Sequence, residues 1–218
     1  MMKGLLIKDF KLLKGQKNFF MIIVAIAIGM STLMEDSSFI IGYLTFVSSL
    51  FTLSTISYDE FDNGNAFLFS LPVTRESYVL EKYEFGFFVG GVFWLFATVI
   101  VVITELIKKT DIVSHTILSA LLVLSVMLIV LAVMLPFQFK FGGEKSRIAI
   151  LGAVGLLFVI GFVVVKIAEL FHIDLPAILN HLPTVSMGML PAAALGIAML
   201  VLLVSLKISM IIMNRKEF

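Results

Sequence analysis

Residues 58–83, YDEFDNGNAFLFSLPVTRESYVLEKY, form the one long polar stretch between strongly apolar segments of this chain. Of its 218 residues, 60% are hydrophobic and only 14% are charged, a balance far from that of soluble globular domains. The flanking apolar segments, about 38–57 and 85–107, each match the roughly 20 residues that a helix needs to cross a bilayer. The stretch therefore predicts a polar connection between two membrane-spanning helices.

Along the whole chain, the same pattern predicts an all-α integral membrane protein, with residues 1–218 forming a single transmembrane domain. Spanning strands would need alternating segments of about 10 residues, which these continuous apolar runs do not provide. Six transmembrane helices are expected, at about 18–34, 38–57, 85–107, 112–139, 148–170 and 187–213. With six spans, both termini lie on the same side of the membrane.

The distribution of lysine and arginine predicts which side that is. Basic residues gather before the first span, in the 58–83 loop, in the loop near residue 140 and in the C-terminal tail, whereas the opposite side has little beyond Lys108 and Lys109. We therefore expect a multi-pass protein of the cell membrane, with both termini and the 58–83 loop in the cytoplasm.

Residues 1–17 have the pattern of a helix lying in the membrane interface. On a helical wheel, Lys3, Lys8, Lys11, Lys14 and Lys17 gather on one side and leucine and phenylalanine on the other. Two interpretations stay open: a positively charged anchor with no further role, or an elbow helix that also touches a cytoplasmic partner.

The residue types needed for catalysis or metal binding are missing from the predicted spans. The chain has no cysteine, and its three histidines show no metal-ligand spacing. The ionisable residues of the spans, such as Glu105 and Lys166, sit near helix ends, where they reach the headgroups. We expect no catalytic residue, no metal site and no cofactor bound by this chain.

Two further ligand classes are disfavoured. The segment 141–146, FGGEKS, departs from a phosphate-binding loop because its lysine does not follow a glycine and residue 138 is Gln where the first glycine would fall. If ATP is involved, another chain hydrolyses it. A net charge of only +1 argues against nucleic acid as a partner.

One predicted span carries a hydroxyl stripe. At 100° per residue, the stripe covers about a third of the helix circumference, and its members are Thr45, Ser48, Ser49, Thr52 and Thr55. Each hydroxyl can bond to a carbonyl one turn back in its own helix, or the stripe can line a pathway or a subunit interface. Both interpretations stay open.

Gly86 and Gly90 form a small-xxx-small pair in the next span, a weak sign of close helix packing.

The 58–83 loop itself predicts a short helix, a break, and a second helix that lies across the membrane surface and continues into the next span. Pro72 ends the first helix, and Thr74 is placed to cap the second, with Glu76 in its first turn at the positive end of the helix dipole. Nothing in this arrangement makes an active site. It makes a lever rooted in two spans, able to pass the motion of a soluble partner to them.

At these residues the chain resembles the permease subunits of type-2 ABC exporters, above all the compact six-span group common in Gram-positive bacteria. The segments that carry the resemblance are 58–60 (YDE), 70–75 (SLPVTR), 79 (V), 82–83 (KY), 136–145 (PFQFKFGGEK) and 3–10 (KGLLIKDF). The stretch 67–69, FLF, departs from the group by being more apolar.

The resemblance implies a half-transporter that forms a homodimer or heterodimer, each copy binding one cytoplasmic ABC ATPase that holds ATP and Mg²⁺. In such a permease the ATPase-coupling residues would be Tyr58, Asp59, Glu60, Leu71, Pro72, Thr74, Arg75, Tyr78, Lys82 and Tyr83, and those of the second cytoplasmic loop Lys140, Gly142, Lys145 and Arg147. Residues 171–187 would form an outer re-entrant segment. Permeases of this kind export amphipathic peptides, bacteriocins or drugs, so peptide export is the expected function.

Two alternatives of other classes remain. An integral-membrane enzyme would need paired acids or histidines inside the spans, and a membrane anchor or sensor subunit would lack a transport pathway. If the purified chain retains an ATPase in detergent, that result favours the exporter over both alternatives.

Overall fold

The structure, a computed structural model, describes residues 2–33, 38–61, 64–108, 113–170 and 189–216. These residues form helices and no strand, which confirms the predicted all-α class. The helices are α1 (Met2–Gly15), α2 (Lys17–Leu33), α3 (Ser38–Glu60), α4 (Gly64–Ser70), α5 (Arg75–Lys108), α6 (Val113–Leu170) and α8 (Met189–Arg215).

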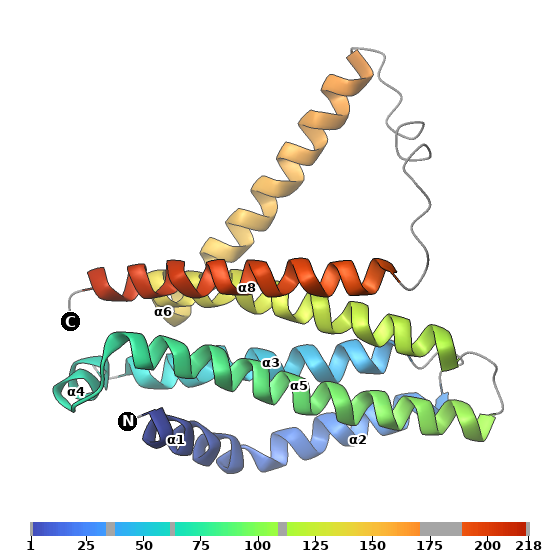
Figure 1. The fold of residues 1–218 in the computed structure, drawn as a ribbon, viewed down its shortest axis with the longest axis horizontal. Coiled ribbons are helices and arrows are strands. Elements are labelled where there is room, and N and C mark those ends of the chain that lie inside the picture. The colour runs from blue at the N-terminus through green and yellow to red at the C-terminus, as the bar shows by residue number, and fades with distance from the viewer. Residues whose placement is uncertain (1, 34–37, 62–63, 109–112, 171–188, 217–218) are drawn as a thin grey trace.

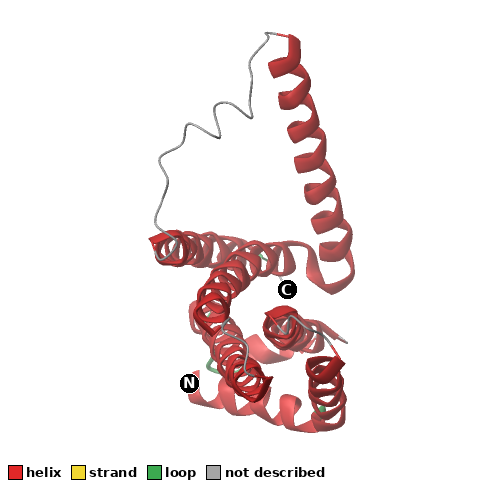
Figure 2. Cartoon of the chain, turned by 90° about the vertical axis from the view of Figure 1, so that its right-hand side faces the viewer, coloured by secondary structure: helices red, strands yellow, loops and turns green. Residues whose placement is uncertain are grey.

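The long helices run side by side, and both chain ends lie at the same end of the bundle as α4 (Figure 1). Helix α3 packs against α5 and α6, while α8 lies along α6. Figure 2 views this bundle from one side and shows the second half of α6 projecting away from it. The common location of the termini fits an even number of crossings; which side of the membrane they face stays a prediction.

Four helical segments are long and apolar enough to cross a membrane: α3, α5, residues 116–143 of α6, and α8. Helix α2 reaches that standard together with α1, from which it is bent by 62°. The predicted span at 148–170 is helical, although most of its side chains lie outside the described residues. The expected re-entrant segment, residues 171–187, also lies outside them.

Large apolar side chains face outward along the bundle. Val99 on α5 is 55% exposed, and Leu203 and Ile211 on α8 are 59% and 55% exposed. In water such surfaces would be unfavourable, whereas in a bilayer they meet acyl chains. The outward faces thus follow directly from the apolar composition.

Helix α5 is longer than a bilayer crossing requires. Its 34 residues span about 50 Å at 1.5 Å per residue, against roughly 30 Å of hydrocarbon. Thr74 caps it as expected: its Oγ1 accepts a hydrogen bond from the backbone N–H of Ser77 at 3.2 Å. The first turns of α5 therefore extend beyond the apolar span and carry polar side chains at the α4 end.

The loop expected near residue 140 is absent. Helix continues on both sides of a single break at Gly142, whose φ of 76° and ψ of 176° are not helical. A side chain is strained at that φ, so glycine is the residue that permits the break. The sequence showed that the chain must turn here but not that one residue suffices.

Candidate functional site

The 58–83 segment connects α3, α4 and α5 at the end of the bundle where the termini lie (Figure 1). Gly64 begins α4 directly against the end of α3: a Cβ there would lie 2.6 Å from the carbonyl oxygen of Asp59. Helix α4 is therefore seated on the end of α3, with no room for a larger residue at the joint.

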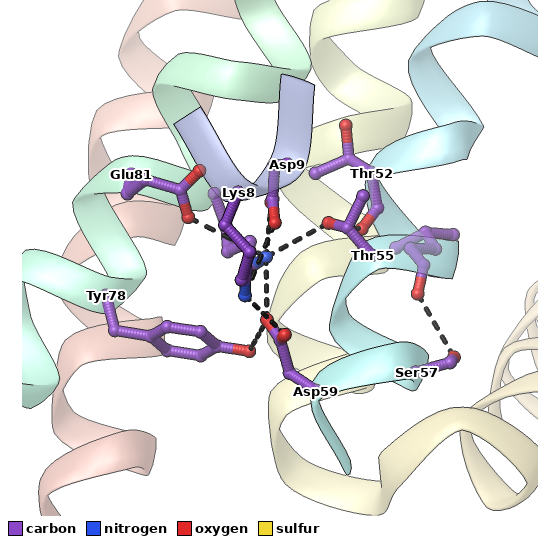
Figure 3. Close-up of polar contacts among 10 residues, drawn as sticks. Lys8, Asp9, Thr52, Thr55, Ser57, Asp59, Tyr78 and Glu81 are labelled. Atoms are coloured by element: carbon purple, nitrogen blue, oxygen red, sulfur yellow. Dashed lines mark hydrogen bonds and ion pairs between the residues drawn. The ribbon is translucent and has the colours of Figure 1, made fainter. Parts of the chain in front are cut away.

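The first turns of α5 place Lys82 inside a cluster of charged side chains. Figure 3 labels the side chains around it: Lys8, Asp9, Thr55, Asp59, Tyr78 and Glu81. Lys82 is fully buried, and its Nζ contacts Asp9 of α1, Asp59 Oδ2 of α3 at 2.8 Å and Glu81 Oε2 at 3.7 Å. The same ammonium donates a hydrogen bond to Thr55 Oγ1 at 3.1 Å. Three helices thus meet at this one charge.

Lys8 and Tyr78 complete the group. Lys8 contacts Asp59 Oδ1 and lies 3.3 Å from Asp9 Oδ1, while the Tyr78 hydroxyl donates to Asp59 Oδ2 at 3.1 Å. The Lys82 ammonium also lies 5.2 Å from the centre of the Tyr78 ring, within cation–π range. We call this group the Lys82 cluster: Lys8, Asp9, Thr55, Asp59, Tyr78, Glu81 and Lys82.

Burial determines what the Lys82 cluster does energetically. Taking charges out of water is expensive, and close pairing only offsets that cost, so a buried ion pair adds little net stability. Removing one partner is different, because it leaves the other charge buried and uncompensated. Since the members come from α1, α3 and α5, the cluster favours one relative arrangement of these helices.

Both carboxylate oxygens of Glu81 accept no hydrogen bond from the described residues.

Glu60 follows Asp59 but faces other elements. Its Oε2 accepts a hydrogen bond from the backbone N–H of Gly143 at 3.0 Å, next to the break in α6. Its Oε1 lies 3.2 Å from Lys216 Nζ in the C-terminal tail, and that ammonium also donates to the carbonyl of Phe139 at 3.2 Å. The last two residues of α3 therefore join it to different helices.

Arg75 links the start of α5 to the end of α8. Its Nη1 donates to the carbonyls of Asn214 at 2.7 Å and Met213 at 3.3 Å. These carbonyls belong to the last turn of α8, where the helix leaves acceptors unpaired and favours positive charge. The arginine of the Leu-Pro-Val-Thr-Arg segment thus stabilises a helix terminus.

Three neighbouring apolar residues of the segment are exposed. Phe67 of α4 is 71% exposed and Leu71 is 45% exposed, and Pro72 beside it is also exposed. We call these three residues the α4 surface. Apolar side chains at this end of the bundle lie beyond the spans, so a protein partner would bury them more favourably than water does.

A cavity of about 820 Å³ lies between α3 and α6, on both sides of the break. Its lining is Leu50, Leu53, Ser54, Ser57, Tyr58, Phe61, Met134, Gln138, Gly143, Ser146 and Leu151. Polar contacts cross one end of it: Gln138 Nε2 donates to Ser57 Oγ at 3.0 Å, and Ser146 Oγ donates to Gln138 Oε1 at 2.6 Å. Its wall is otherwise mainly apolar.

All five members of the hydroxyl stripe are buried in this structure. Thr45, Ser49 and Thr55 donate to carbonyls in their own helix at 2.6–3.0 Å. The stripe faces α5, where a Cβ on Gly86 would meet Thr52 Oγ1 at 3.0 Å and one on Gly90 would meet Ser49 Cβ at 3.1 Å. In this conformation the stripe is a helix contact; that it lines a pathway stays a prediction.

The other predicted residues are scattered. Tyr83 is buried, and its hydroxyl shares hydrogen bonds with Ser205 at 2.6 Å and Ser209 at 2.8 Å on α8. Tyr58 is exposed, as are Lys140 and Lys145 of the predicted second loop. The side chain of Arg147 lies outside the described residues.

Several contact residues escaped the sequence prediction. They are Lys8, Asp9, Glu81, Gln138, Ser146 and Lys216. Asp9 offered one signal, since it is the single acid in a stretch of lysines, and Glu81 directly precedes Lys82, a predicted coupling residue. Among the described residues, no group of three or more His, Asp or Glu side chains is arranged to hold a metal ion.

These helices and their apolar faces define a multi-pass membrane protein with a polar joint at one end. A model of the ABC-2 family transporter proteins matches residues 4–214, nearly the whole chain. The chain therefore belongs to the ABC-2 transporter family, as its loop motifs indicated. No curated protein and no solved structure matched it.

Proposed function

We propose that this chain is the transmembrane permease subunit of an ATP-binding-cassette exporter, with a separate cytoplasmic ATPase binding at the 58–83 segment. The observation that carries the proposal is the α4 surface, an exposed apolar surface seated on α3 and followed directly by α5. ATP and Mg²⁺ belong to the ATPase, and this chain does no chemistry of its own.

The geometry supports a lever. A push on α4 acts on α3 through the close contact at Gly64 and on α5 through the short connection that contains Pro72. The Lys82 cluster ties both helices to α1, so α1, α3 and α5 move as one unit. ATP-driven closure of two ATPases on a permease dimer, of identical or paralogous copies, then moves the spans between inward- and outward-facing states.

Amphipathic peptides are the proposed cargo. The cavity between α3 and α6 supports this class, because an apolar wall with hydroxyl and amide groups at one end suits a molecule with both kinds of surface. The hydroxyl stripe of α3 is proposed to join the pathway when the helices separate.

Co-purification tests the partnership. The chain is expressed with a candidate ABC ATPase from the same organism and purified in detergent, as wild type, Phe67→Ser and Phe39→Ser. Phe39 is a matched control because it is 58% exposed but lies at the opposite end of α3. We expect wild type and Phe39→Ser to retain the ATPase and Phe67→Ser to lose most of it. Equal retention by all three variants, or none by wild type, would contradict the proposal.

A further inference from the structure

The break in α6 has its own set of contacts, separate from the Lys82 cluster. Gly142 leaves the helical conformation, and the second half of α6 then departs from the bundle (Figures 1 and 2). Gly143 is the first residue after this break, so its backbone N–H lacks a partner one turn back. Glu60 of α3 accepts that N–H at 3.0 Å.

Lys216 connects the same carboxylate to the other side of the break. Its Nζ lies 3.2 Å from Glu60 Oε1 and donates to the carbonyl of Phe139, in the first half of α6, at 3.2 Å. Glu60 and Lys216 together therefore bridge the two halves. Their side chains keep 17% and 28% exposure, so the pair is hydrated in part and weaker than a fully buried one.

The surroundings leave little space at this point. A Cβ on Gly142 would lie 3.2 Å from Glu60 Oε2, and one on Gly143 would lie 2.6 Å from Ser57 Oγ. Gly142 therefore allows the Glu60 carboxylate to approach the backbone closely, and Gly143 allows the same for the Ser57 side chain. A positive φ, two neighbouring glycines and an external carboxylate on the freed N–H mark a built joint rather than a frayed helix end.

We propose that Gly142 is a hinge and that the Glu60–Lys216 pair is a latch that sets the angle of the second half of α6. The α3–α6 cavity is lined by Met134 and Gln138 before the hinge and by Gly143, Ser146 and Leu151 after it. A change of angle therefore widens or narrows that cavity.

The latch deepens the proposed function, and its meaning for transport rests on that function. Glu60 is the last residue of α3, directly beside the joint with α4, so displacement of α4 reaches the latch within a few residues. The Lys82 cluster holds its helices together, whereas this weaker pair can open without separating them. A partner pushing on α4 would thus release the hinge and leave the bundle intact.

Distance measurements between paired spin labels test the hinge on the chain alone. The sequence contains no cysteine, so cysteines introduced for labelling are unique. One pair, Phe162→Cys with Leu203→Cys, joins the second half of α6 to α8; both positions are well exposed. The control pair, Val126→Cys with Leu203→Cys, joins the first half of α6 to the same reference.

Each pair is measured in the otherwise unchanged chain, in Glu60→Ala and in Lys216→Met, with the exposed Glu84→Ala as a matched control. We expect the 162–203 distance distribution to shift and broaden in Glu60→Ala and Lys216→Met, and the 126–203 distribution to stay unchanged. Lys216 lies after the last helix, so its variant tests the latch even if Glu60→Ala does not fold.

Two results would overturn the latch: an unchanged 162–203 distribution in Lys216→Met and in any folded Glu60 variant, or an equal shift of the control pair. No ATPase is present in this experiment. The distance measurements therefore do not depend on whether an ATPase binds the α4 surface. If they overturn the latch, the proposed binding of an ATPase is still open to its own test.

Discussion

The 58–83 segment has two halves with opposite character. Its tip is the α4 surface, where Phe67 and Leu71 present apolar side chains to solvent. Its base belongs to the Lys82 cluster, where Asp59, Tyr78 and Lys82 bury charged and polar groups. One half offers an unpartnered surface and the other has its partners within the chain. The proposed function assigns binding of the ATPase to the tip and transmission of its movement to the base.

A lever needs both properties. If the base were exposed, a force applied at the tip would unfold it locally and would not reach the spans. Because the base is buried and charged, separating its helices would leave unpaired charges in a low-dielectric interior, which is costly. The comparison therefore predicts that base variants change stability and tip variants change only binding.

Lys82→Met should have the largest effect. It leaves Asp9 and Asp59 buried with only the partly exposed Lys8 as counter-charge, and breaking a buried pair in this way destabilises by about 3–5 kcal/mol. Thermal unfolding in detergent measures the loss, with the exposed Lys140→Met as control. An unchanged melting temperature would show that the cluster does not hold the base.

Gly90→Ala should have a smaller effect, because it overpacks the contact between α3, α5 and α6. The new methyl would meet Met127 Cε at 2.9 Å and Ser49 Cβ at 3.1 Å, and such overpacking destabilises by about 1–3 kcal/mol. Gly91→Ala is the neighbouring control, since a Cβ there has nothing within 4 Å. Equal melting temperatures for the two variants would refute the tight packing along α5.

Thr74→Ala should remove the cap of α5. The lost hydrogen bond to the Ser77 N–H is worth about 1 kcal/mol, and Thr74→Ser should keep it because serine caps at least as well as threonine. Denaturation of wild type, Thr74→Ala and Thr74→Ser under the same conditions ranks their free energies of unfolding. Loss in Thr74→Ser as large as in Thr74→Ala would point to a role of the methyl group instead.

Leu71→Ser should have the smallest effect on stability, within about 0.5 kcal/mol, because the side chain is exposed. Its effect should appear in ATPase retention, as for Phe67→Ser. A variant that unfolds more easily yet retains the ATPase fully would reverse the roles assigned to tip and base.

Local patterns in the sequence were sufficient for the helical class and for the boundary between α4 and α5, but not for the continuation of helix past residue 140. Pro72 and Thr74 mark the end of α4 and the start of α5 by chemistry that acts within a few residues, and the structure has both. The apolar runs likewise fixed the helical class, and the loop motifs indicated the family that the comparison confirms.

The contacts within the site were not predictable in the same way. Asp9 and Lys82 are separated by 73 residues, and no periodicity relates them. Glu60 and Asp59 are neighbours in a motif that suggested one shared surface, yet the turn of the helix directs them to different elements. The break at Gly142 is accompanied by a hydrogen bond from Gly143 to a carboxylate of another helix, which a local pattern cannot reveal.

In the proposed function, the Lys82 cluster transmits to the spans the movement that the ATPase imposes on the α4 surface. The most direct test is the amount of a fluorescent amphipathic peptide moved per ATP hydrolysed in vesicles containing the permease and its ATPase, compared between wild type and Asp59→Asn. Asp59 joins α1, α3 and α5 but is largely buried, so its variant should retain the ATPase and its hydrolysis while the transport ratio falls. An unchanged ratio in folded Asp59→Asn would contradict the account.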